Sequence, residues 1–151
     1  MILYLDTSAL VKLFVEEVDS GILRSAAARS TLIVTHLIAY AEACAAFARL
    51  AQNRADKTLF ARLRRALDRH WTEWQIVAVD DALVRRAGEL AVRYGLRGYD
   101  SVHLAAVEAV RGASRGHADV HFGVFDTALA RAAKLAGFPL VESWPHTRPP
   151  R

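Results

Sequence analysis

The sequence predicts an α/β fold, with three layers (α/β/α) around a central, mainly parallel sheet of four or five strands. Short runs of branched and aromatic residues alternate with longer segments of helical period, as in chains built from right-handed crossovers. The runs lack polar alternation, which is typical of parallel strands buried on both faces. The expected strands are ILYL (2–5), TLIVT (31–35), QIVAV (75–79) and HFGVF (121–125), with PLV (139–141) as a candidate fifth.

The segments between these runs carry helical patterns. Residues 8–16 follow the first strand as a helix, and residues 57–71 separate an apolar stripe from arginines, which predicts an amphipathic helix. Residues 82–94 repeat the pattern, with charges spaced for ion pairs on the solvent side. The apolar stripes are Leu59, Phe60, Leu63, Leu67 and Trp71 in the first of these amphipathic helices, and Leu83, Ala87, Leu90 and Tyr94 in the second.

Length and composition indicate one domain. A chain of 151 residues, 53% of them hydrophobic, can bury one core. We expect residues 1–144 to form this domain and residues 145–151 to be a flexible tail. No basic start followed by a long apolar run is present, so we expect neither a signal peptide nor a membrane span, and a cytoplasmic location. The single cysteine, Cys44, is expected to be a small buried side chain without a redox role.

The chain carries a net charge of +4 and has a pI of about 9.6, mainly because of arginine. Arginine suits phosphate contacts, but this charge alone hardly favours nucleic acid. An acidic pocket inside a basic exterior would change that, because it suits a polyanion held against a metal ion. The spacing of the acids therefore decides the interpretation.

Three aspartates follow strand runs, where open α/β sheets bind their ligands. These are Asp6, Asp80 and Asp126, and Asp100 starts a further helix after a glycine. Aspartate is also a favoured helix N-cap, because its side chain accepts hydrogen bonds from free backbone N–H groups. Taken singly, each of the four fits a cap at least as well as a ligand.

Glu42 favours the ligand interpretation. It lies inside the stretch THLIAYAEACAAFARLA (35–51), which is apolar until Arg49, so we expect a buried helix with a carboxylate far from either end. A buried carboxylate must be paired, protonated or bound to a cation. A divalent cation relieves the repulsion among gathered carboxylates. A site of carboxylates without cysteine or clustered histidine suits Mg²⁺ or Mn²⁺ rather than zinc.

Four stretches of the chain match one known family in order and spacing. They are LDTSALVKLF (5–14), AYAEACAAFARL (39–50), LRGYDSVHLAAVEA (96–109) and FGVFDTALARAAKLAGF (122–138). Through them the chain resembles the PIN-domain nucleases, most closely the VapC-type ribonuclease toxins of toxin–antitoxin pairs. The resemblance implies a PIN-like fold and a metal site formed by Asp6, Glu42, Asp100 and Asp126. It also implies a supporting hydroxyl at Ser8; Thr7 ranks lower, because its side chain can equally point into packing.

The activity implied by this resemblance is hydrolysis of RNA phosphodiester bonds with one or two Mg²⁺ or Mn²⁺ ions. The chemistry of the acids independently permits it. Asp6, Asp100 and Asp126 are then the expected direct ligands, whereas Glu42 either binds metal through water or positions the nucleophile. The resemblance also implies a cognate VapB-type antitoxin and a homodimer.

Other signals are weaker. His103 matches a histidine frequent in the family, and we expect a structural hydrogen bond rather than catalysis. In HADVH (117–121), His117, Asp119 and His121 would share one side of an extended segment and resemble a second metal site, but chance surface histidines are the favoured interpretation. Val124 stands where the family often has Ser or Thr. Asp80 and Asp81 are expected to start a helix and to be structural.

The arginines and tryptophans between residues 62 and 74 each allow a functional and a structural interpretation. Arg62, Arg64, Arg65 and Arg69 would either guide RNA or form a solvated helix face. Trp71 and Trp74 would either contact bases or a partner, or pack as ordinary core aromatics, which is commoner.

Two alternative functions were weighed. A haloacid-dehalogenase phosphatase also has an early aspartate after its first strand, but it needs a second aspartate two residues later, where this chain has Ser8. That class is therefore excluded. The remaining alternative is a non-catalytic PIN-fold module that binds RNA or protein, against which the presence of all four acids argues.

Overall fold

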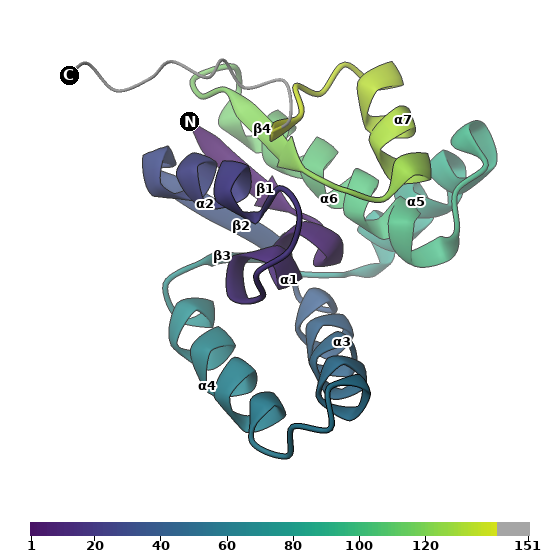
Figure 1. Cartoon of the computed structure of the whole chain (residues 1–151). Coiled ribbons are helices and arrows are strands. Elements are labelled where there is room, and N and C mark those ends of the chain that lie inside the picture. The colour runs from purple at the N-terminus through teal and green to yellow at the C-terminus, as the bar shows by residue number, and fades with distance from the viewer. Residues whose placement is uncertain (142–151) are drawn as a thin grey trace.

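Four parallel strands form the central sheet of the computed structural model, which describes residues 1–141. The strands are β1 (Ile2–Leu5), β2 (Leu32–His36), β3 (Gln75–Val77) and β4 (Val120–Gly123), and they lie in the order β3-β2-β1-β4 (Figure 1). All three pairings are parallel, as predicted. The candidate fifth strand contributes only an isolated parallel bridge between Phe122 and Leu140. The predicted tail lies outside the described residues.

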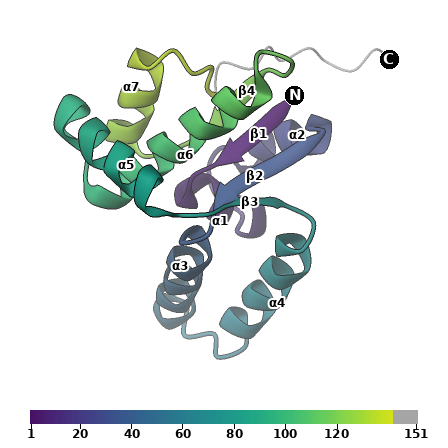
Figure 2. The same ribbon diagram turned by 180° about the vertical axis from the view of Figure 1, so that it is seen from behind.

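Helices cover both faces of this sheet, which confirms the predicted three-layer α/β/α arrangement. On one face lie the helices up to residue 71, and on the other lie the later ones (Figures 1 and 2). In both views α3 and α4 run side by side and extend away from the sheet. The helices are α1 (Thr7–Phe14), α2 (Ser20–Arg29), α3 (Ala39–Asn53), α4 (Leu59–Trp71), α5 (Asp81–Tyr94), α6 (Gly98–Ser114) and α7 (Thr127–Leu135).

The alternation of side chains along β1 divides the core into two layers. Tyr4 faces α5, α6 and α7, and its ring meets that of Phe122 edge-on with 5.3 Å between the centroids. Leu3 and Leu5 point to the opposite face, into the layer formed with α1 to α4. All three β1 side chains are fully buried. Because full burial of a large apolar side chain contributes about 1.5–3 kcal/mol, β1 is anchored on both sides.

Helix α3 differs from its prediction. It begins at Ala39, so Glu42 lies in the first turn rather than far from either end. Only the stripe of Ala39, Ala43 and Phe47 is buried, and Cys44 is half-buried rather than buried. The physical reason is that small apolar side chains expose little area, so an alanine-rich helix needs burial on one side only. The expectation of a helix buried all round was therefore wrong.

The two amphipathic helices confirm their predictions. In α4 the buried residues are Leu59, Leu63 and Leu67, and in α5 they are Leu83, Ala87 and Leu90. No helix within residues 1–141 has the length and apolar character needed to cross a membrane.

A close approach between β4 and α1 fixes the start of α1. A Cβ atom added at Gly123 would lie 2.9 Å from Cδ2 of Leu5 and 3.3 Å from Cβ of Ala9, so glycine leaves the room this contact needs. The backbone N–H of Asp6 donates to the Gly123 carbonyl at 3.0 Å. Asp6 is thereby held beside the end of β4, and the chain after β4 leads directly to Asp126.

Candidate active site

Asp6 follows β1 and is both a helix cap and a buried carboxylate. Its Oδ1 accepts the N–H of Ala9 at 2.7 Å, which caps α1, and the hydroxyl of Ser8 lies 2.7 and 2.8 Å from its two oxygens. Asp6 is 3% exposed. Burial raises the pKa of Asp6 to about 6. The charge of Asp126 acts in the same direction, while His103 and the hydrogen bonds from Ala9 and Ser8 offset only part of the rise. Burial is therefore the dominant influence on this carboxylate.

Ser8 ties two segments of the site together. Besides donating to Asp6, its Oγ accepts the backbone N–H of Phe125 at 2.9 Å. Phe125 immediately precedes Asp126, so one hydroxyl links the start of α1 to the segment after β4. Val124 is buried and has no hydroxyl to contribute here. The contacts of Ser8 fit the supporting position expected for it.

Thr7, Glu42 and His103 form a hydrogen-bonded group beside Asp6. The Thr7 hydroxyl donates to Oε2 of Glu42 at 2.7 Å, and Nε2 of His103 lies 3.3 Å from the same oxygen and 3.2 Å from Oγ1 of Thr7. Burial alone would raise the pKa of Glu42, but the contacts with His103 and Thr7 outweigh it and lower this pKa below its ordinary value. Thr7 thus points at an acid rather than into packing.

The hydrogen bonds assign the protons along this group. Tyr4 is fully buried, and burial together with the charges of Asp6 and Glu42 raises the pKa of its phenol, which therefore keeps its proton. Its hydroxyl lies 3.2 Å from Nδ1 of His103 and donates to it. His103 then carries a proton on Nε2, which faces Thr7 and Glu42. His103 is 2% exposed and makes the structural hydrogen bonds expected of it.

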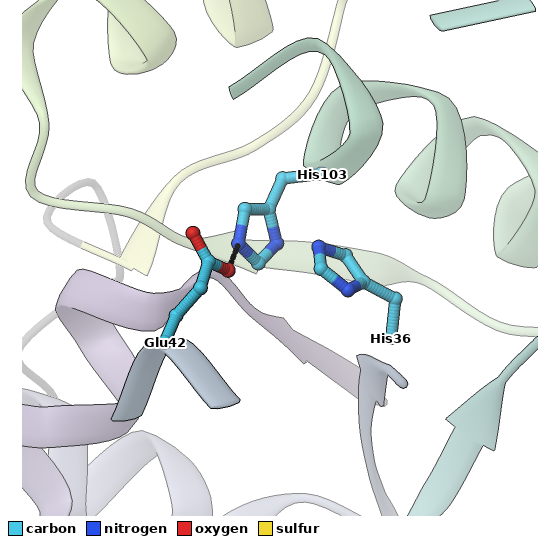
Figure 3. Close-up of side chains that lie close together, drawn as sticks. All are labelled: His36, Glu42 and His103. Atoms are coloured by element: carbon cyan, nitrogen blue, oxygen red, sulfur yellow. Dashed lines mark ion pairs between the residues drawn. The ribbon is translucent and has the colours of Figure 1, made fainter. Parts of the chain in front are cut away.

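His36, at the end of β2, was missed by the sequence reasoning. Within the described residues, His36, Glu42 and His103 are the one group of three metal-ligand types whose ligand atoms all lie within 4.8 Å of one another (Figure 3). The rings of His36 and His103 have centroids 4.0 Å apart. The expectation of a site without clustered histidine was therefore wrong. The position of His36 at a strand end was the signal that would have found it.

This group serves better to position Glu42 than to bind a metal. The N–H of Ala39 donates to Nδ1 of His36 at 3.2 Å, which leaves the proton on Nε2 and no free lone pair there. Burial, with a smaller contribution from the nearby His103, lowers the pKa of His36 to about 3, so His36 stays neutral. Both nitrogens of His103 are already engaged. Of the three side chains, Glu42 is the one that offers a cation the oxygen ligands that Mg²⁺ prefers.

Asp100 and Asp126 are joined by Arg97, a second residue that the sequence reasoning missed. Nε of Arg97 donates to Oδ2 of Asp100 at 2.8 Å, and Nη2 donates to Oδ2 of Asp126 at 3.2 Å. The hydrogen bond to Asp100, followed by the charges of Asp100 and Asp126, raises the pKa of Arg97. The i, i+3 spacing of Arg97 and Asp100 within a helical pattern was the available signal.

The two acids sit differently on their helices. Asp126 is the N-cap of α7, where its Oδ1 accepts the N–H of Leu129 at 2.9 Å. Asp100 lies in the first turn of α6, whose N-cap is Arg97, so Asp100 is not the cap that its position suggested. For Asp126, as for Asp6, capping and a place in the site are compatible, since each carboxylate has two oxygens. Arg97 joins Asp100 to Asp126, and the charge of Asp126 acts on Asp6. Within residues 1–141, the ligand atoms of no three of the four acids all lie within 4.8 Å of one another.

The other sequence signals lie away from these acids or are not formed. Asp80 caps α5 by accepting the N–H of Leu83 at 2.9 Å, and Asp81 pairs with Arg85 at 2.7 Å; both are structural, as predicted. Strand β4 begins only at Val120, so residues 117–121 are not one extended segment. Among the described residues no three-ligand group includes them.

The aromatic residues near α4 pack against neighbours. Trp71 meets Tyr40 edge-on with 5.1 Å between ring centroids, and Trp74 lies 6.2 Å from Phe14. These contacts favour the packing interpretation of both tryptophans. Arg64 lies 3.8 Å from Asp68 in a pair exposed to solvent, as on an ordinary helix surface.

Known proteins are similar to this chain over most of its length. The family model described as "PIN domain" matches residues 3–135. Two relatives from Mycobacterium tuberculosis, ribonuclease VapC45 of strain CDC 1551 / Oshkosh and ribonuclease VapC49 of strain ATCC 25618 / H37Rv, are each 31% identical over 137 residues, covering 90% of this chain and 92% of the relative.

Two solved structures share the fold. M. tuberculosis VapC20, described as a sarcin–ricin loop cleaving toxin, superposes with a TM-score of 0.63 at 20% identity, over 90% of this chain and 95% of that one. A chain of a toxin–antitoxin complex from Klebsiella pneumoniae gives a TM-score of 0.59 at 16% identity, over 83% and 87%.

Proposed function

The chain belongs to the PIN domain family, and from this membership we propose that it is a metal-dependent endoribonuclease that hydrolyses phosphodiester bonds in RNA. The names of its two relatives, both ribonucleases, support the proposal. The observation that carries it is that hydrogen bonds link acids from distant segments: Thr7, next to Asp6, bonds Glu42, and Arg97 bonds both Asp100 and Asp126.

The donor set fits a divalent cation that prefers oxygen ligands. Asp6 is a buried carboxylate whose pKa is raised by burial, and Asp100 and Asp126 already attract a guanidinium. We infer Mg²⁺, with Mn²⁺ also supporting activity, held directly by Asp6, Asp100 and Asp126. When bound, such an ion supplies Lewis-acid stabilisation of the phosphate and lowers the pKa of a bound water.

The remaining side chains orient the acids. The hydroxyl of Ser8 lies within hydrogen-bond distance of both oxygens of Asp6, which restricts the orientation of this carboxylate. Thr7 and His103 hold Glu42 and lower its pKa, so Glu42 is ionised at neutral pH. An ionised Glu42 can accept a hydrogen bond from the attacking water or bind the metal through water. In either role Glu42 acts through a water molecule rather than as a direct metal ligand.

We further propose that the protein is the toxin of a VapBC-type pair, restrained by a cognate antitoxin, and that it forms a homodimer. The description of one solved neighbour as part of a toxin–antitoxin complex and of another as a toxin supports the antitoxin. The family resemblance supports the dimer.

Cleavage of RNA by the purified full chain tests the nuclease. Metal-stripped protein is incubated with total cellular RNA, with Mn²⁺ or Mg²⁺ added, and matched samples contain excess EDTA. We expect metal-dependent cleavage that EDTA stops and that the Asp6→Asn variant lacks. Intact RNA after incubation with folded, metal-loaded, antitoxin-free protein contradicts the proposal. Retained RNA binding would then favour the alternative of a non-catalytic PIN module.

Expression in a bacterial host tests the toxin. We expect growth arrest by the wild-type chain, relief when the adjacent small open reading frame is co-expressed, and normal growth with Asp6→Asn at equal protein level. Normal growth of cells that contain active wild-type enzyme contradicts the toxin role without touching the nuclease proposal.

A further inference from the structure

Arg97 places a positive charge between two acids of the candidate site. Its guanidinium uses different nitrogens for the two, Nε for Asp100 and Nη2 for Asp126, at 2.8 and 3.2 Å. Asp100 belongs to the first turn of α6, and Asp126 precedes α7. The same two carboxylates would lend their charge to a divalent cation. Arg97, which belongs to the same protein, therefore already supplies a positive charge to these two carboxylates.

Arg97 is the movable partner of the three. Its side chain is 78% exposed, whereas those of Asp100 and Asp126 are 15% and 31% exposed. Asp126 is also fixed by the hydrogen bond from Leu129 that caps α7. A long, exposed side chain gains little from a surface ion pair and is readily hydrated when it leaves. The acids cannot follow it into solvent, because their helices hold them.

We propose that Arg97 competes with the divalent cation for Asp100 and Asp126, so that metal binding requires the guanidinium to leave these carboxylates. The inference rests on the proposed function, since it takes both acids as metal ligands. Two positive charges on the same oxygens repel each other, and an oxygen that accepts a hydrogen bond from an N–H is a poorer metal ligand. In the metal-free protein Arg97 is paired with both acids. The consequence is a metal affinity lower than the acids alone would give.

The chain offers a matched control in Arg86. This arginine also bridges two carboxylates, with Nε 2.9 Å from Oε2 of Glu108 and Nη1 2.7 Å from Oε2 of Glu89. It lies on α5, outside the candidate site. Replacing Arg86 by glutamine removes the same charge and the same kind of bridge. Any effect of net charge on metal binding therefore appears in both variants.

Titration calorimetry with Mn²⁺ as the probe tests the competition. Metal-stripped wild type, Arg97→Gln and Arg86→Gln are compared at equal ionic strength, after circular dichroism and thermal unfolding have shown that each is folded. We expect the Kd for Mn²⁺ to fall about three- to tenfold in Arg97→Gln, because the competing ion pairs are exposed and weak. Arg86→Gln should match the wild type. Arg97→Met, a second neutral replacement of similar length, should behave as Arg97→Gln does.

Each other outcome overturns the proposal in a recognisable way. Equal affinity in Arg97→Gln and wild type means that the guanidinium does not compete, and leaves the nuclease intact. Weaker binding means that Arg97 organises the acids for the metal instead. An equal gain in Arg86→Gln reduces the effect to net charge. Absence of Mn²⁺ binding in all the proteins refutes the metal site itself and the proposed function with it.

Discussion

The hydroxyl of Thr7 donates to Oε2 of Glu42 across 2.7 Å and joins residues 35 positions apart in the chain. The same oxygen of Glu42 also faces Nε2 of His103 at 3.3 Å. Glu42 is therefore held by one side chain from α1 and one from α6. The orientation of the Glu42 side chain therefore depends on contacts with α1 and α6 and not on α3 alone, the helix that carries it.

Thr7→Val should impair catalysis and preserve the fold. Valine keeps the shape of threonine but removes the donor to Glu42, so the carboxylate is less firmly oriented. We expect kcat/KM for RNA cleavage to fall about ten- to a hundredfold, as for other residues that orient a ligand or base. Thr72→Val is the control, because the Thr72 hydroxyl donates only to the exposed carbonyl of Arg69. Equal activity in the two variants would remove Thr7 from the positioning group.

The buried carboxylate of Asp6 should make the metal-free protein less stable as the pH rises from about 4 to 6. Its pKa of about 6 in the folded state lies above the ordinary 3.8, so within this window the folded state binds more protons than the unfolded state. The stabilisation is present at low pH and is lost as the pH rises through the folded pKa. The two pKa values correspond to a change of at most about 3 kcal/mol.

Urea unfolding in excess EDTA at a series of pH values measures this change. The difference in unfolding free energy between wild type and Asp6→Asn isolates the contribution of Asp6, because asparagine does not titrate. We expect Asp6→Asn to gain stability relative to wild type across the window. A difference that stays constant with pH would show that burial does not raise this pKa.

Ser8→Ala should destabilise the protein as well as reduce cleavage. The substitution leaves the Phe125 N–H without its acceptor and removes one of the donors to Asp6, which keeps the N–H of Ala9. Unsatisfied groups of this kind cost about 1–3 kcal/mol. The urea unfolding midpoint and RNA cleavage are measured beside Ser114→Ala, which loses only a hydrogen bond to the exposed carbonyl of Arg111. An unchanged unfolding free energy in Ser8→Ala would mean that water replaces the hydroxyl at no cost.

Asp126 and Asp80 cap helices in the same way, so paired substitutions separate capping from chemistry. Asp126→Asn keeps a good N-cap and should leave stability nearly unchanged while abolishing cleavage, because the charge is lost. Asp80→Ala should lower the unfolding free energy by about 1 kcal/mol and leave cleavage unchanged. Thermal unfolding and RNA cleavage are measured on both. An active Asp126→Asn variant would contradict a role for Asp126 in the reaction. A folded but inactive Asp80→Ala variant would contradict a purely structural role for Asp80.

Local sequence patterns were enough to predict the fold class and to show that the aspartates follow strands or begin helices. The strand runs are local and apolar, and their alternation with helical segments requires parallel pairing, as β1, β2, β3 and β4 confirm. The aspartates that cap helices could also be predicted from the sequence, because an N-cap depends only on the few residues around the start of a helix. Asp6, Asp80 and Asp126 all cap helices.

The tertiary structure alone decided which acids lie together and what accompanies them. Asp80 and Asp126 have the same local pattern, but Asp80 follows β3, which is separated from β1 by β2, whereas Asp126 follows β4, the neighbour of β1. Strand order arises from long-range packing, which local patterns do not encode. The same holds for the contact between the rings of His36 and His103, for the hydrogen bond from Arg97 to Asp126, and for the exposed side of α3. Each depends on contacts between segments distant in sequence, whose geometry is fixed only when both faces of the sheet are covered.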